Sequence, residues 1–204
     1  TDMNNMFYDA NLFNQDISGW DVSKVTDMNS MFTYAVTFNN GLPGGNATGD
    51  GLNSWDVTEV TDMNGMFSNA RLFNQDISSW DPTKVTNMKN MFTNASLFNQ
   101  DISGWDVSEV TDMNKMFFFA VAFNNGLLGG DATGDGLNLW DVSKVTNMSY
   151  MFSYASLFNQ DISSWNVGGV TSMAKMFEEA AIFNSDLSSW DVTEVTDMSY
   201  MFYA

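Results

Sequence analysis

The sequence predicts an α/β solenoid in which each repeat of about 25 residues supplies one short strand and one short helix. Three observations lead to this fold class. One short unit recurs along the chain, its large apolar residues keep fixed places in that unit, and their spacing changes within it. Repeats of this kind bury their apolar residues by stacking on their neighbours, which would align the strands in a parallel sheet on one face.

The repeat is visible in the residues that open and fill each unit. The opening residues are Thr1, Thr26, Thr61, Thr86, Thr111, Thr146, Thr171 and Thr196. All seven tryptophans share one place in the unit, at Trp20, Trp55, Trp80, Trp105, Trp140, Trp165 and Trp190. The 16 methionines share two further places. We therefore predict continuous layers of identical side chains through a stacked core.

Residues 1–204 form a single array of seven full coils and a partial eighth, which we expect to be a fragment of a longer array. Two coils carry ten extra residues, at about 40–51 (NGLPGGNATGDG) and 125–136 (NGLLGGDATGDG). These segments are rich in Gly, so we predict loops. Insertions at one point of the cycle emerge on one face, where repeat proteins often bind.

The elements within a unit follow from the spacing of its apolar residues. From Met28 to Phe38 they recur at intervals of three and four, which predicts a helix. Thr26 and Asp27 would cap its N-terminus. Trp20 and Val22 alternate around a polar residue, which predicts a short strand with one buried face.

Two polar columns predict how the coils register. One Asn follows a buried Phe in each coil, and we expect its side chain to satisfy backbone groups of the next coil. These residues are Asn14, Asn39, Asn74, Asn99, Asn124, Asn159 and Asn184. In a second column Lys and Glu alternate, as in Lys84 and Glu109, which predicts a row of surface ion pairs between neighbouring coils.

Two strings represent the unit well, FNQDISGWDVSKVTDMNSMF at 13–32 and FNQDISSWDPTKVTNMKNMF at 73–92. They resemble the BspA-like leucine-rich repeat surface proteins, also described as the bacterial surface protein 26-residue repeat or mycoplasma lipoprotein repeat family. The resemblance covers the whole chain and departs from the family pattern at the two insertions, at Pro82 and at 166–169. It implies a right-handed coil of the leucine-rich repeat type, located extracellularly or on a cell surface, with a role in adhesion and protein binding.

Charge and composition exclude several classes of function. Seven Lys and Arg against 25 Asp and Glu give a net charge of -18, which repels nucleic acid and anionic lipid. The chain has neither Cys nor His, and no apolar run long enough for direct insertion into a membrane. Carboxylates recur in every coil, whereas a catalytic pair would be singular. We therefore predict no enzymatic activity and no cofactor, although the sequence leaves calcium open.

One column of carboxylates is a candidate binding surface, on what would be the concave face of the sheet. It consists of Asp21, Asp56, Asp81, Asp106, Asp141 and Asp191. Two interpretations stay open. Like charges about 5 Å apart would raise one another's pKa values or attract cations. Alternatively, neighbouring Ser and Thr hydroxyls or backbone amides would absorb the charge.

The insertions hold further candidates. Asp50 and Asp135 lie in Gly-Asp-Gly sequences whose oxygens suit calcium, although a turn with Gly at positive φ explains the same residues. Asn46 lies in an N-x-T sequon of an exposed loop and would be the glycosylation site in a eukaryotic secretory host.

Aromatic residues that depart from the repeat are the last candidate. Phe118, Phe119 and Tyr154 would form an exposed patch that contacts a protein or a glycan, unless the adjacent insertion covers it. Two functions remain. The first is a binding or adhesion module for a protein or glycan on another cell or matrix. The second is a structural spacer, surface layer or filament component that self-associates.

Overall fold

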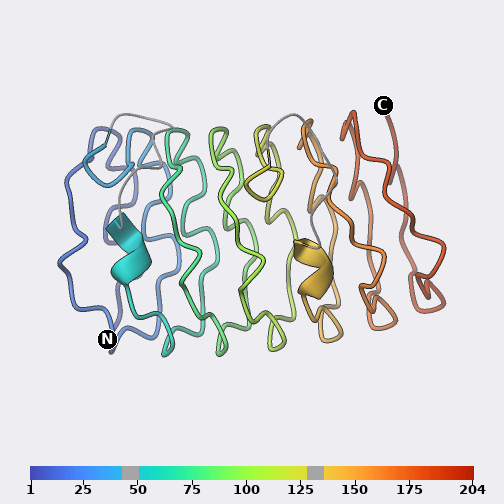
Figure 1. Cartoon of the computed structure of the whole chain (residues 1–204), viewed down its shortest axis with the longest axis horizontal. Coiled ribbons are helices and arrows are strands. Elements are labelled where there is room, and N and C mark those ends of the chain that lie inside the picture. The colour runs from blue at the N-terminus through green and yellow to red at the C-terminus, as the bar shows by residue number, and fades with distance from the viewer. Residues whose placement is uncertain (43–50, 128–135) are drawn as a thin grey trace.

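The computed structural model describes residues 1–42, 51–127 and 136–204. The chain winds into stacked coils, with its two termini at opposite ends of the long axis (Figure 1). We number the coils 1 to 8 by their opening residues, Thr1, Thr26, Thr61, Thr86, Thr111, Thr146, Thr171 and Thr196. Neighbouring coils are joined by single parallel β-bridges at one column, from Asp2↔Asp27 through Asn87↔Asp112 to Ser172↔Asp197. Each sequence unit is therefore one coil.

The predicted fold class, an α/β solenoid with one strand and one helix in each repeat and a parallel sheet, is wrong. In the described ranges the only helices are the short 3-10 helices η1 (Gly51–Ser54) and η2 (Leu137–Leu139). Both lie where an insertion returns to its coil. No extended strand occurs in those ranges, because the bridges between coils are isolated. There is consequently no concave sheet face, and no described helix is long and apolar enough to cross a membrane.

The predicted helix fails because its backbone hydrogen bonds alternate between two directions. In coil 4, the N–H groups of Met91 and Thr93 close turns within the coil, at 3.2 and 3.0 Å. The N–H groups of Asn90 and Phe92 alternate with them along the chain and donate to carbonyls of coil 5, at 2.9 and 2.8 Å. An α-helix would direct all four to carbonyls of its own turn. Each coil thus uses half of these groups to hold its neighbour.

Residues with positive φ recur four apart in this segment, and we call them the two left-handed columns. The first contains Asn5, Ser30, Gly65, Asn90, Lys115, Tyr150, Lys175 and Tyr200. The second contains Asp9, Tyr34, Asn69, Asn94, Phe119, Tyr154 and Glu179. A left-handed residue every fourth position produces a spacing of three and four without a helix. The Asn, Asp and Gly residues in these columns favour that conformation.

The predicted strand around each Trp is also a series of turns. In coil 4, the N–H of Trp105 donates to the carbonyl of Ile102 at 3.1 Å, and Val110 closes a similar turn at 2.9 Å. These turns use backbone donors that a ladder between strands would need. The coils are joined here by a side chain instead, because Trp105 Nε1 donates to the carbonyl of Ile77 in coil 3 at 3.0 Å.

The core consists of the predicted layers. The Met, Phe and Val columns are buried through the interior coils, as for Met88, Phe92 and Val110. Successive rings stack along the axis, with centroids 5.6 Å apart for Phe92 and Phe117 and 6.2 Å apart for Trp80 and Trp105. The placement of the apolar columns in a continuous core is thus confirmed, although the secondary structure is not.

The predicted asparagine ladder is confirmed. The side-chain oxygen of Asn74 accepts from the N–H of Asn99 at 2.8 Å, and Asn99 does the same for Asn124 at 2.8 Å. The bond recurs in other coils at 2.8 or 2.9 Å. In contrast, the predicted helix cap at Asp27 is wrong. With no helix to cap, its carboxylate accepts from the N–H of Asn29 at 2.8 Å in a local turn.

Both insertions are anchored in the same way at their first residues. The side-chain oxygen of Asn125 accepts from the N–H of Ile102 at 2.9 Å, and Asn40 repeats this bond with Ile17 at 2.8 Å. In addition, Asn99 Nδ2 donates to the carbonyl of Leu127 at 3.0 Å. The two inserted coils are therefore attached to the stack by duplicated contacts.

Candidate functional site

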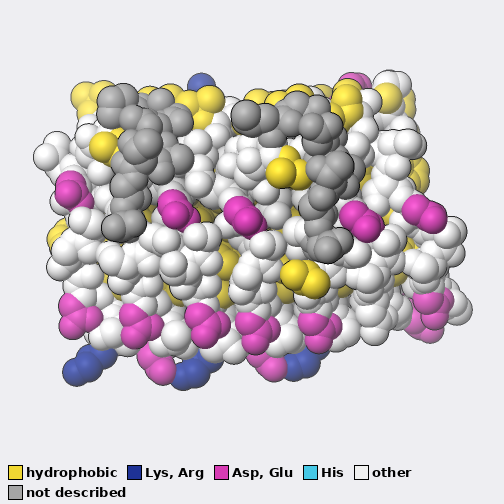
Figure 2. Space-filling model, in the orientation of Figure 1, with side chains coloured by type: hydrophobic (Ala, Val, Ile, Leu, Met, Phe, Trp, Pro, Cys, Tyr) yellow, Lys and Arg dark blue, Asp and Glu magenta, His cyan; other side chains and the backbone are white. Residues whose placement is uncertain are grey.

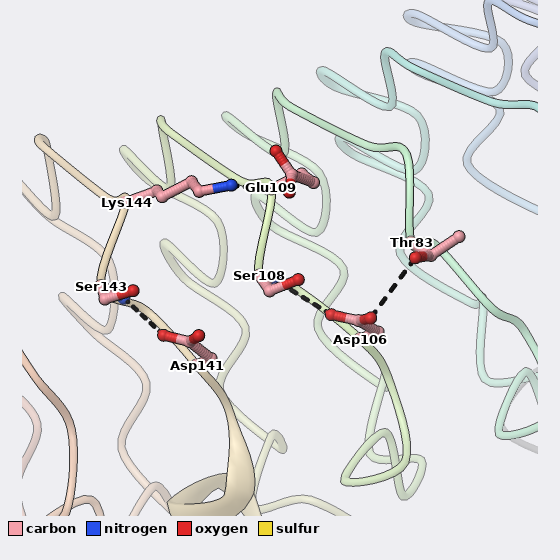
Figure 3. A network of polar contacts seen from close by, with 7 residues as sticks. All are labelled: Thr83, Asp106, Ser108, Glu109, Asp141, Ser143 and Lys144. Carbon is pink, nitrogen blue, oxygen red and sulfur yellow. Dashed lines mark hydrogen bonds and ion pairs between the residues drawn. The ribbon is translucent and has the colours of Figure 1, made fainter.

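The candidate aspartate column lies exposed along the stack, and local hydrogen bonds fix its carboxylates. Asp106 accepts from the N–H of Ser108 at 3.0 Å, and Asp141 accepts from Ser143 at 3.0 Å (Figure 3). The second oxygen of Asp106 accepts from the Thr83 hydroxyl at 3.3 Å. Asp21, Asp56 and Asp191 make the same bond to the residue two positions ahead. Asp81 lies exposed in the same column and precedes Pro82.

These hydrogen bonds set the charge state of the column. The hydroxyl and N–H of Ser23 lower the pKa of Asp21, and those of Thr58 lower the pKa of Asp56. The pKa values of Asp106, Asp141 and Asp191 are lowered by the same kind of contact. Repulsion from Asp21 raises the pKa of Asp56, but this effect is the smaller one. Of the two interpretations left open by the sequence, absorption of the charge by neighbouring hydroxyls and backbone amides therefore agrees with the structure, because hydrogen bonding to the charged form dominates.

The described residues hold no group of three or more acidic side chains arranged for a metal ion. The column supplies at most one carboxylate to each coil, and Asn166 replaces it in coil 6, so its carboxylates do not converge on a point. Asp50 and Asp135, the calcium candidates, and Asn46, the glycosylation candidate, lie outside the described residues.

Ion pairs between neighbouring coils run beside this column. Lys84 Nζ lies 2.6 Å from Glu59, and Lys144 Nζ lies 2.6 Å from Glu109. Figure 2 shows acidic side chains in rows, with the visible Lys and Arg side chains mainly along the lower edge. These contacts confirm the predicted pairing of the Lys and Glu column. Because the side chains are about half exposed, each pair contributes little to stability.

The structure brings together the three candidate aromatic residues. Phe119 and Tyr154 belong to coils 5 and 6, and their rings stack in parallel with centroids 4.2 Å apart and an interplanar angle of 4°. Phe118 packs edge-on against both, at 4.7 Å from Phe119 and 6.3 Å from Tyr154. The side chain of Phe119 is 37% exposed. Part of this cluster is therefore open to solvent.

Sequence reasoning missed three members of this cluster. Lys115 Nζ lies 5.6 Å from the ring centroid of Phe118 and 5.1 Å from that of Tyr150. Lys175 Nζ also lies over the Tyr150 ring, 5.6 Å from its centroid. Lys and Tyr alternate in the first left-handed column from coil 5 onward. This alternation of Lys and Tyr is the sequence signal for cation–π contacts between coils, as alternating Lys and Glu is for ion pairs.

Backbone strain is present in this cluster, as it is at Tyr34, Glu179 and Tyr200 in other coils. Lys115, Phe119, Tyr150 and Tyr154 all have φ between 57° and 60°. Left-handed backbone costs an L-residue roughly 1–2 kcal/mol, and less for Asn or Gly. Coils 3 and 4 carry only Gly and Asn in the same two columns, at Gly65, Asn69, Asn90 and Asn94. Bulky residues at the strained positions of coils 5 and 6 thus need another reason than local backbone preference.

A smaller pair occupies the corresponding place in the first two coils. The rings of Tyr8 and Tyr34 meet edge-on with centroids 6.0 Å apart, in the relationship that Phe118 has to Tyr154. Both tyrosines are about half exposed to solvent. No lysine shares their coils at the left-handed columns, so this pair lacks the cation–π contacts of the larger cluster.

A shallow polar depression between coils 6 and 7 has a different character. Asn159, Asp161, Asn184 and Asp186 line it together with two serines. Asp161 and Asp186 already accept backbone N–H groups at 2.9 Å, which are the bonds made by this column elsewhere. The depression thus repeats the ordinary surface of the coils.

Comparison with known proteins gives one result. Residues 1–49, 44–134 and 128–204 match one protein family, so the matches together span the chain. No curated protein and no solved structure matched the chain. Three tandem matches confirm that this is a repeat protein, and they agree with the resemblance to mycoplasma repeats. The chain belongs to the family described as Mycoplasma protein of unknown function, DUF285.

Proposed function

We propose that this chain is a non-enzymatic binding module, displayed on a cell surface or secreted, that contacts a protein through Phe118, Phe119 and Tyr154. The observation that carries the proposal is a parallel stack of two aromatic rings from neighbouring coils, at positions of left-handed backbone on the surface. Phe119 is partly exposed, and both Phe119 and Tyr154 occupy left-handed positions where coils 3 and 4 have Asn. Strain of this kind gathers at functional sites.

The chemistry of the cluster supports a protein partner. Aromatic residues supply large apolar contact areas and dominate the energetics of protein interfaces. Phe119 and Tyr154 cover one face of each other's ring, and Phe118 stands edge-on to both. The surface left to a partner is thus an uneven apolar patch rather than one open ring face. Apolar side chains of a protein fit such a patch better than a flat sugar ring.

Adhesion and surface display rest on the resemblance of the repeat strings to BspA-like surface proteins. The absence of a catalytic role is supported by the carboxylates, whose local hydrogen bonds recur from coil to coil. A repeated structural bond leaves no single acid–base pair that differs from the rest of the array. Function is better sought where the repeat is broken.

A structural role, as a spacer, surface layer or filament component, is the second candidate. The uniform bonding between coils favours it, because the same backbone and Asn contacts recur at each described interface. A structural component would bind no partner through the aromatic cluster. It would instead form ordered filaments or layers, visible by electron microscopy as the concentration is raised.

The test uses immobilised collagen, laminin and mucin together with an array of free glycans. The wild-type chain is compared with the double variant Phe119→Asn/Tyr154→Asn, which places in coils 5 and 6 the residue that coils 3 and 4 carry. Tyr34→Asn is the control, because it makes the same change outside the cluster. We expect one of the proteins to bind the wild type and Tyr34→Asn, and to bind the double variant at least tenfold more weakly.

Two results would contradict this proposal. One is equal binding of the wild type and the double variant to the proteins, provided that circular dichroism shows the double variant to be folded like the wild type. The other is binding to glycans alone, which would leave the cluster as a sugar site rather than a protein contact.

A further inference from the structure

The turn segments of five consecutive coils contain no acidic residue, and we call the surface that they form the turn face. It consists of the turn segments of coils 2 to 6, at 29–34, 64–69, 89–94, 114–119 and 149–154. Backbone hydrogen bonds place these segments side by side, for example from Asn90 to Asn114 at 2.9 Å. No Asp or Glu occurs in them, although the chain has 25, whereas the equivalent segments of coils 1 and 7 carry Asp9, Glu178 and Glu179. Glu178 is paired with Lys175. Lys89 and Lys115 give this face a positive charge on a molecule of net charge -18.

Lys115 lies on the turn face beside the aromatic cluster and differs from the paired lysines. Lys84, Lys144 and Lys175 each form an ion pair with a Glu at 2.6 to 2.8 Å. Within the described part of the chain, Lys115 makes no such pair. Its ammonium group instead lies over the rings of Phe118 and Tyr150. Ring faces attract a cation but leave its charge uncompensated by an anion.

We infer that the partner segment held by this cluster is an acidic peptide whose carboxylate pairs with Lys115. The inference rests on the proposed function, since it names the chemistry of the partner at the same site. An apolar side chain of the peptide packs against Phe119 and Tyr154, and a neighbouring Asp or Glu reaches the ammonium group. Charge complementarity of this kind gives specificity and speeds association.

The distribution of charge explains why the occupant is a peptide segment and not a long polyanion. A nucleic acid would extend over the aspartate columns of neighbouring faces, and their charge would repel it. A short acidic segment stays within the turn face, where coils 4 to 6 present two lysines and no carboxylate. The apolar rings beside Lys115 also favour a ligand that carries apolar side chains, which peptides have and phosphate polymers lack.

The test is selection from a random 12-residue peptide library displayed on phage, with the immobilised chain as target. Selection on the wild type is run in parallel with selection on Phe119→Asn/Tyr154→Asn. Peptides enriched on the wild type are synthesised and titrated against Lys115→Gln, Lys115→Arg and Lys24→Gln. Lys24 lies in the Lys and Glu column away from the cluster, so its variant controls for the general change in charge.

We expect the enriched peptides to combine Asp or Glu with aromatic or aliphatic residues. Their affinity should fall roughly five- to tenfold in Lys115→Gln, because that variant loses one partly exposed ion pair to the peptide. It should stay unchanged in Lys24→Gln. Lys115→Arg should keep most of the affinity, and binding should weaken as salt is added.

The outcomes separate this inference from the function on which it rests. Enriched peptides without an excess of acidic residues, or with equal affinity for Lys115→Gln, would overturn the acidic partner and leave the aromatic binding site in place. Failure to enrich any peptide on the wild type over the double variant would overturn both.

Discussion

Phe119 and Tyr154 stack with their ring centroids 4.2 Å apart, although each holds a left-handed backbone with φ of 57° and 60°. The contact links coil 5 to coil 6 on the surface of the stack. An aromatic pair stabilises by about 0.5–1.5 kcal/mol beyond its buried area, which is close to the cost of left-handed backbone at one residue. The rings thus offset part of a strain that their own residues introduce.

Substitutions at Phe119 should separate the ring contact from the backbone preference. Phe119→Asn and Phe119→Ala both remove the stacking, but Asn tolerates positive φ better. We expect the Asn variant to be more stable by about 0.5–1 kcal/mol, measured by urea denaturation. The same two substitutions at Leu97 are the control, because Leu97 is exposed and lacks positive φ. Equal stability of the two Phe119 variants would show that the left-handed backbone carries no cost there.

Trp80→Phe should destabilise the chain by about 2–4 kcal/mol, because it opens a cavity and leaves a buried carbonyl without its donor. Trp80 Nε1 donates to the carbonyl of Leu52 at 2.7 Å, and both side chains are buried. Trp190→Phe is the matched control, since Trp190 makes the same bond at 3.2 Å in a half-buried position. Chemical denaturation should show less than half the effect for the control. A reversed order would indicate that burial of the bond has no influence.

Asn99→Ala should cost about 2–4 kcal/mol, because the Asn99 side chain bonds three backbone groups. Its oxygen accepts from Asn124 at 2.8 Å and from Gly126 at 3.0 Å, and its amide donates to Leu127 at 3.0 Å. Asn184→Ala changes the same column where the side chain makes no hydrogen bond within the described residues, and should cost less than about 1 kcal/mol. Thermal and urea denaturation test both. Similar losses in the two variants would argue against the ladder as a source of stability.

The aspartate column should make part of the stability depend on pH. Hydrogen bonds from Ser108 lower the pKa of Asp106 below its ordinary value of 3.8. A carboxyl group with a lowered pKa in the folded state stabilises the fold above the ordinary value, and this contribution is lost as the pH falls through the lowered pKa. Asp106→Ala should thus differ from the wild type at pH 7 and approach it below pH 3.8.

Asn166 provides the control for this titration, because it accepts from Gly168 at 3.2 Å in the same column without carrying a charge. Asn166→Ala should shift the urea midpoint by the same amount at pH 7 and at low pH. A difference for Asp106→Ala that is constant or larger in acid would contradict the assigned cause.

The aspartate columns should cause no change in melting temperature when calcium is added at fixed ionic strength. Calcium takes six to eight oxygen ligands, and the described acidic side chains form no group of three or more that could hold a metal ion. The melt is compared with calcium and with a chelator, in the wild type and in Asp50→Asn/Asp135→Asn. A saturable rise that persists in the double variant would contradict the expectation, whereas a rise lost in that variant would locate the ion in the insertions.

Much of the packing could be predicted from the sequence because identical residues recur at identical places. The Met, Phe and Trp columns, the asparagine ladder and the pairing of Lys84 with Glu59 all depend on register, and the period establishes the register. The secondary structure could not be predicted in the same way. Met28 and Phe32 would share one side of a helix, and a series of turns buries them equally well.

A signal against the helix was present in the polar residues between the apolar ones. Asn90 and Asn94, and likewise Gly65 and Asn69, lie four apart and favour positive φ, which a helix excludes. Lys115 and Phe119 hide this signal in coil 5, because neither residue type indicates left-handed backbone. The aromatic cluster was predicted in part, since its rings interrupt the repeat, while Lys115 and Lys175 were missed because they were read one coil at a time.

The uniform bonding between coils has a consequence for folding. Asn99 would accept the N–H of any coil that presented an Asn at the same place, so the core does not distinguish its correct neighbour from one a full turn away. A growing stack of this kind is exposed to slippage by whole coils. The N–H of Ile102 is accepted by Asn125 and that of Ile17 by Asn40, both in inserted coils, whereas coil 7 supplies Ser185 at the same place. The inserted coils thus differ from their neighbours at this contact, and they distinguish the correct register from one shifted by a single coil.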